Sequence, residues 1–174
     1  MSLFRGRRKV RLTRHRTVDS PFGQLRISYD GWPSVIAVLD GPNVPTVTTL
    51  PGRDLGGMTF DGRPIPLQRA GRAWSMSRAS RTRTALVGDR GYELRPTGLR
   101  RALLLRDGTP IAAAHGTLRS YSPFREIPGL DARLRWQPGI DPTDVAIGQA
   151  LVIAFGAGAP GALANVFLFW LDWI

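Results

Sequence analysis

The segment from Ala146 to Trp170, AIGQALVIAFGAGAPGALANVFLFW, contains no charged residue and constrains the fold more than any other stretch. Such a run crosses a membrane, fills a protein core, or binds a dinucleotide through its glycines. Asp141 or Thr143 can cap a helix just before it, and Asp144 in the first turn complements the helix dipole. A helix that is apolar on every face is enclosed by protein or by lipid. We therefore expect a helix that begins at residue 143 and is covered on all sides.

Three glycines and a proline interrupt this segment. Gly156, Gly158 and Gly161 match G-x-G-x-x-G, but only 13 residues follow Gly161, and a dinucleotide site needs a second strand with an acidic residue about 20 residues further on. Pro160 removes a backbone donor and disfavours helix at the residue before it. We expect the helix to break here, leaving a core helix over 143–155 and a short apolar terminal helix. A membrane anchor over 145–171 is the alternative.

Asp-Gly turns punctuate the chain before this segment. The pattern Asp-Gly-x-Pro occurs at 30–33, 61–64 and 107–110, and tight hairpin turns favour Asp-Gly because both central residues take positive φ. The run DARLRWQ at 131–137 alternates apolar residues with Arg133 and Arg135, as a half-buried strand does. We expect an antiparallel meander of about ten strands over 22–137, with 40–56 as its longest loop.

The run GYELRPTGLRRALLLRDGTPIAAA, followed by a strand and an apolar C-terminal helix, resembles the tubby-like group, which includes the LURP-one-related and phospholipid scramblase proteins. The resemblance covers roughly residues 72–155. It implies a mainly β fold in which an antiparallel meander closes into a barrel and the hydrophobic C-terminal helix fills the barrel as a core plug. Better-known members of the group bind membrane phosphoinositides or other lipids. The last 19 residues extend beyond the usual end of such a helix.

Positive charge is concentrated near the N-terminus. The formal net charge is +11, and 23 of the 24 basic residues are arginines. Residues 5–16 read RGRRKVRLTRHR, and a cluster of this kind is attracted to anionic lipid or to nucleic-acid phosphates, or is simply solvated. Sequence-specific nucleic-acid binding is not expected, because no recognition motif accompanies the cluster. The basic residues assigned to an anionic surface are Arg5, Arg7, Arg8, Lys9, Arg11, Arg14 and Arg16.

No constellation of residues indicates a reaction. Cysteine is absent, and His15 and His115 are the only histidines. The sequence lacks a nucleophile elbow, a phosphate-binding loop and a zinc-protease motif. We therefore expect no catalytic residue, no metal, no cofactor and no small-molecule substrate. Exposed apolar clusters mark contact surfaces, so four aromatic residues are assigned to a partner or lipid contact: Phe167, Phe169, Trp170 and Trp173.

The sequence thus predicts a basic N-terminal arm over 1–20 and a single β-barrel-like domain over 21–174, with its hydrophobic helical segment at 143–172. The predicted function is non-enzymatic binding to an anionic membrane surface or a protein partner through an Arg-rich face. A tail-anchored membrane protein with a soluble basic β domain is the alternative, and a non-specific nucleic-acid-binding protein is a further one. No apolar run follows the basic start as in a secretory signal, so we expect a cytoplasmic protein, with membrane association left open.

Overall fold

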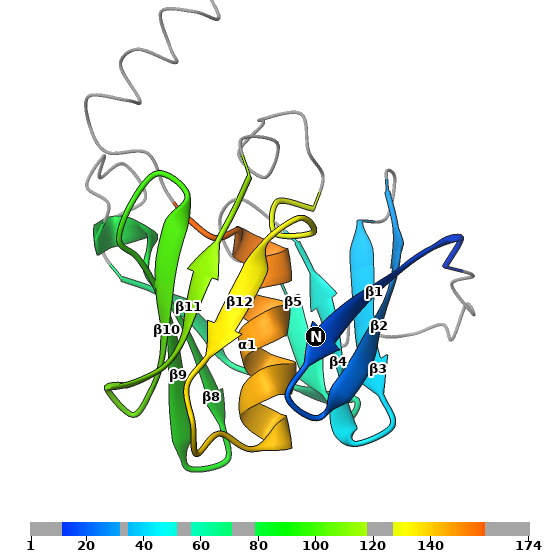
Figure 1. The fold of residues 1–174 in the computed structure, drawn as a ribbon, viewed down its shortest axis with the longest axis horizontal. Helices are drawn as coiled ribbons and strands as arrows, with labels where there is room; N and C mark the ends of the chain where they lie inside the picture. The colour runs from blue at the N-terminus through cyan, green and yellow to red at the C-terminus, as the bar shows by residue number, and fades with distance from the viewer. Residues whose placement is uncertain (1–11, 32–34, 52–56, 71–78, 118–126, 159–174) are drawn as a thin grey trace, which may run out of the picture.

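The computed structural model describes residues 12–31, 35–51, 57–70, 79–117 and 127–158. Over these residues the chain forms two antiparallel sheets of six strands each, with one α-helix between them (Figure 1). Within each sheet the strands follow the order of the chain, so that each strand pairs with its sequence neighbours in the same sheet. This is the meander that the Asp-Gly turns predict.

The first sheet lies on one side of the helix. Its strands are β1 (Arg14–Ser20), β2 (Gly23–Asp30), β3 (Ile36–Gly41), β4 (Val44–Leu50), β5 (Gly57–Phe60) and β6 (Arg63–Pro64). Side chains on its inner face come from alternate positions, as a half-buried sheet requires, and they include Leu25, Ile27, Leu39 and Val47. Residues 14–20 of the expected arm thus belong to this sheet as β1, which pairs along its whole length with β2.

The second sheet lies on the opposite side of the helix. Its strands are β7 (Leu67–Arg69), β8 (Arg83–Val87), β9 (Arg90–Pro96), β10 (Arg101–Arg106), β11 (Thr109–His115) and β12 (Arg133–Trp136). A short 3-10 helix, Ala79–Arg81, precedes β8. In β12 the predicted alternation is confirmed, because Leu134 and Trp136 pack against the core while Arg133 and Arg135 are exposed.

Helix α1 (Pro142–Phe155) occupies the space between the sheets (Figure 1). Every residue from Asp144 to Ala154 is buried, and the helix packs against β3, β4, β9 and β11. Asp141 caps the helix and forms a capping box with Asp144, and the helix ends at Gly156, whose φ is 83°. The enclosed helix and its break at the glycines are both confirmed. The expected terminal helix lies outside the described residues.

Two of the predicted turns have the expected backbone. Asp61–Gly62 and Asp107–Gly108 have positive φ at both residues and join β5 to β6 and β10 to β11. At the third predicted turn, 30–33, the flanking strands β2 and β3 pair as expected, but part of the turn itself lies outside the described residues. The long loop expected over 40–56 is wrong, because 44–50 forms β4, paired with β3 and β5.

Among the strands that the structure describes, none pairs across from one sheet to the other. Between β6 and β7 the chain changes sheets: Ile65 N–H donates to Met58 of the first sheet, and Leu86 N–H of the second donates to the Pro66 carbonyl. Within the described residues, β1 and β12 are edge strands without a strand partner on their outer sides. The structure therefore shows two sheets around a helix, and closure into a barrel stays a prediction.

Candidate anion-binding surface

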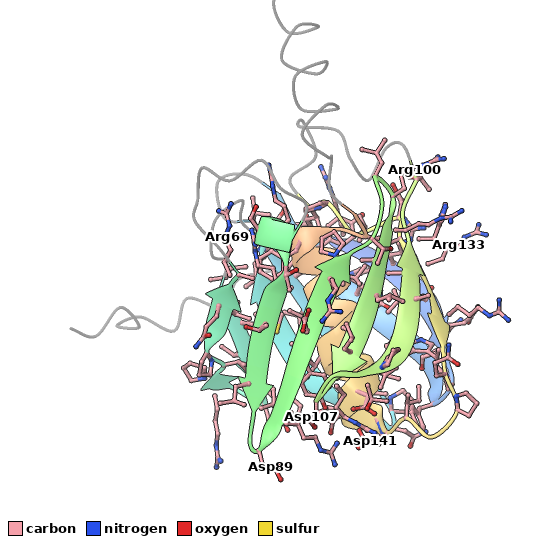
Figure 2. All side chains as sticks on the ribbon, turned by 90° about the vertical axis from the view of Figure 1, so that its left-hand side faces the viewer. Arg69, Asp89, Arg100, Asp107, Arg133 and Asp141 are labelled. Atoms are coloured by element: carbon pink, nitrogen blue, oxygen red, sulfur yellow. The ribbon has the colours of Figure 1, made fainter. Side chains whose placement is uncertain are left out.

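Several aspartates lie at one end of the domain and several arginines at the other. In Figure 2, Asp89, Asp107 and Asp141 lie at one end, whereas Arg69, Arg100 and Arg133 lie at the other. The aspartates follow from turn and cap chemistry, because hairpin turns and helix N-termini both favour Asp. We call these the acidic end and the basic end.

Strand register assembles the basic end from three neighbouring strands. Arg101 at the start of β10 lies opposite His115 at the end of β11, and His115 lies opposite Arg133 at the start of β12. All three side chains are exposed, and Arg100 precedes them in the turn between β9 and β10. Directly opposite residues have Cβ atoms about 5 Å apart, so the three form one row across the sheet.

Ion pairing distinguishes this row from four other arginines, Arg16, Arg90, Arg95 and Arg106. Arg95 lies 2.7 Å from Glu93, Arg16 pairs with Asp131, and Arg90 pairs with Asp141. By contrast, among the described parts of the chain no carboxylate lies within ion-pair distance of Arg100, Arg101, Arg133 or Arg135. Guanidinium groups that are exposed and unneutralised are available to an external anion.

The described part of the chain ends at the basic end. After Gly156 caps the helix, Gly158 packs so closely on the turn before β10 that an added Cβ would lie 2.3 Å from the Leu99 carbonyl oxygen and 2.8 Å from the Arg100 Cα. The sequence that follows, residues 159–171, contains no charged residue. The start of an apolar segment is therefore next to unneutralised arginines.

A buried polar cluster holds the helix start at the acidic end. Asp144 is fully buried and accepts hydrogen bonds from the Tyr92 hydroxyl at 3.0 Å, the Arg106 guanidinium at 2.5 Å and the Asp141 backbone N–H at 2.9 Å. Burial, with a further contribution from the hydrogen bond to Asp144, raises the pKa of Tyr92 to about 12, so its hydroxyl remains a donor. These contacts tie α1 to β9 and β10. The Asp144 carboxylate, the Tyr92 hydroxyl and the Arg106 guanidinium thus have their hydrogen-bond partners within the protein.

The predicted site residues fall mainly outside the described residues. These are Arg5, Arg7, Arg8, Lys9 and Arg11 in the arm, and Phe167, Phe169, Trp170 and Trp173 near the C-terminus. Arg14 and Arg16 lie in β1 with exposed side chains, and Arg16 is neutralised by Asp131. Sequence reasoning missed the row on β10, β11 and β12, because only the strand register brings Arg101, His115 and Arg133 together.

No described helix has both the length and the apolar character of a membrane span. Residues 145–155, the first part of the alternative anchor, pack against protein. Across the part of the chain that the structure describes, no three His, Asp or Glu side chains lie together as a metal site would require.

Comparison of the chain with protein-family models, with curated proteins and with solved structures gives no match.

Proposed function

We propose that this protein is a non-enzymatic binding protein that attaches to an anionic membrane surface through its basic end. The observation that carries the proposal is the position of Gly158, which lies beside Arg100 and directly precedes the uncharged segment 159–171 in the sequence. Cationic side chains and an adjacent apolar segment are the two components that peripheral membrane attachment uses together.

The energetics of the basic end suit such attachment. Each Lys or Arg near an anionic surface contributes about 1 kcal/mol, and aromatic side chains favour the interface between headgroups and acyl chains. Arg100, Arg101 and Arg133 would meet the headgroups, together with the arm residues Arg5, Arg7, Arg8, Lys9 and Arg11. Phe167, Phe169, Trp170 and Trp173 would enter the interface. The acidic end would face away because the same surface repels it.

Two finer features belong to this proposal. The two-residue crossing at Ile65–Pro66 and the ion pair between Arg16 on β1 and Asp131 just before β12 support closure of the sheets into a barrel around α1. The twelve described strands around an apolar helix also support membership of the tubby-like group. On this basis we place the protein at the cytoplasmic side of a membrane.

Vesicle sedimentation tests the attachment. The wild-type chain should bind vesicles of 30% phosphatidylserine in phosphatidylcholine more tightly than pure phosphatidylcholine, and the difference should shrink at high salt, because ions screen exposed charges within about 8 Å at physiological ionic strength. Arg100→Gln/Arg101→Gln should weaken binding about 30-fold, corresponding to about 1 kcal/mol for each of the two charges removed.

The matched control is Arg26→Gln/Arg63→Gln, which removes the same charge away from the basic end and should bind nearly as wild type does. Replacing Arg5, Arg7, Arg8 and Lys9 with Gln tests the arm in the same assay. Equal losses for the two double variants would overturn the role of the basic end. Duplex DNA binding that is stronger than vesicle binding would favour the nucleic-acid alternative.

A further inference from the structure

The outer face of the second sheet contains a groove beside the row of Arg101, His115 and Arg133, which we call the basic row. It has a volume of about 440 Å³ and runs across β10, β11 and β12. This volume is within the range of small-molecule sites, about 300–1,000 Å³. The side chains that bound it on the outer face are Arg101, Leu103, Ala113, His115, Arg133 and Arg135.

Two rows of side chains line the groove, and they make one half of it basic and the other half apolar. The first row is Arg101, His115 and Arg133, in which two arginines stand two strand spacings apart, about 10 Å, on either side of the histidine. Arginine side chains extending from this separation can converge on one anion and bind it through charge-assisted hydrogen bonds. This half suits a single anionic group.

The second row forms an apolar floor. Two residues further along the strands, Leu103 lies opposite Ala113, which lies opposite Arg135. Leu103 and Ala113 are half-buried, and the small Ala113 side chain leaves the surface hollow between Leu103 and the Arg135 aliphatic stem. An apolar chain extending from the bound anion would cover this floor.

We propose that this groove binds a single-chain amphiphile with a carboxylate head, the chemistry of a fatty acid. Charge complementarity favours an anionic head, which a carboxylate supplies, since no carboxylate of the described chain neutralises Arg101, Arg133 or Arg135. The floor selects the tail. A bilayer phospholipid could use only the first row, because its acyl chains remain in the membrane. This inference goes beyond membrane attachment, which requires the charges but not the floor.

Octanoate titration tests the inference with the full chain, followed by calorimetry and by amide chemical shifts. Octanoate should bind at least tenfold more tightly than acetate, which has the head alone, or 1-octanol, which has the tail alone. The shifts should centre on the amides of Ala113, His115 and Arg133. Comparable binding of octanoate and acetate, or shifts centred elsewhere, would overturn the proposal.

Two variants address the two halves separately. Arg101→Gln/Arg133→Gln should weaken octanoate binding at least tenfold, whereas Arg63→Gln on β6 should leave it unchanged. Ala113→Phe fills the floor and should weaken octanoate binding to the level of acetate, while vesicle binding stays as in wild type because no charge is lost. Full octanoate affinity in Ala113→Phe would refute the groove, whatever the vesicle result.

Discussion

At the scale of single residues, the most constrained position is Asp144. A carboxylate buried without partners is strongly destabilising, and here Tyr92, Arg106 and the Asp141 backbone all donate to it. The same carboxylate completes the capping box of α1. Removal of any one donor would leave a buried charge less satisfied, so this cluster specifies where the helix begins.

Asp141, the other half of the capping box, makes the free energy of unfolding depend on pH in the acid range. Burial opposes its ionisation, but hydrogen bonds from the Asp144 and Thr143 backbone N–H groups and from Arg90 outweigh burial and lower its pKa. Because the folded pKa lies below the unfolded one, the stabilisation is complete above the unfolded pKa of about 4 and is lost as pH falls through the folded pKa.

Urea unfolding between pH 7 and pH 2 measures this effect. Asp141→Asn retains a good N-cap but loses the charge, so it should be slightly less stable than wild type at pH 7 and should approach wild type as pH falls through the lowered pKa of Asp141. A difference that is constant across this pH range would contradict the assignment.

At the scale of elements, α1 is the core shared by both sheets. The side chains of Val145, Ile147, Leu151, Val152 and Ile153 are fully buried. Burial of five such side chains contributes about 10 kcal/mol, which is comparable to the whole stability of a typical domain.

Two truncations test this dependence. A chain ending at Pro142 should aggregate or unfold, whereas a chain ending at Gly158 should stay folded, as shown by dispersed amide signals and a cooperative melt. The second truncation is the control, because it retains the whole helix. A soluble, cooperatively melting 1–142 fragment would show that the sheets fold without the helix.

Local signals predicted many of these elements from sequence, but not all. The helix and the hairpins at Asp61–Gly62 and Asp107–Gly108 follow from local composition. Strand β4 was missed because Pro45 argues against a central strand. Pairing with β5 begins only at Val47, and the register with β3 shifts just before the turn, so Pro45 lies outside the regular part of both ladders.

The basic row was beyond sequence reasoning for a different reason. Alternation places Arg133 and Arg135 on the outer face of a strand, but it does not indicate which residues of other strands lie beside them. That depends on the register of β10, β11 and β12, and the register includes a shift between Leu104 and Leu105. Arg101 thus forms one row with His115, which is 14 positions further along the chain, and with Arg133, which is 32 positions further.

At the scale of the whole molecule, the shared helix should make the two sheets unfold together. Leu39 on β3 and Leu104 on β10 are fully buried in the same core cluster. Leu39→Ala should cost about 3 kcal/mol, and the loss should accelerate amide exchange in β9 and β10 as much as in β3 and β4.

Leu104→Ala should have the reciprocal effect, and native-state hydrogen exchange measures both. The exposed Leu86→Ala serves as the control and should change exchange little in either sheet. Faster exchange confined to the mutated sheet would mean that the sheets are independent folding units.

The position of α1 in the chain also sets the order of events during synthesis. The twelve described strands all precede the helix, so a growing chain carries both sheets before it carries the element that covers their inner faces. Chains grow by about 5–20 residues each second, which leaves these apolar faces without their partner for about a second or more. Incomplete sheets of this kind are prone to aggregate, and chaperone binding to the nascent chain would protect them until the helix is made.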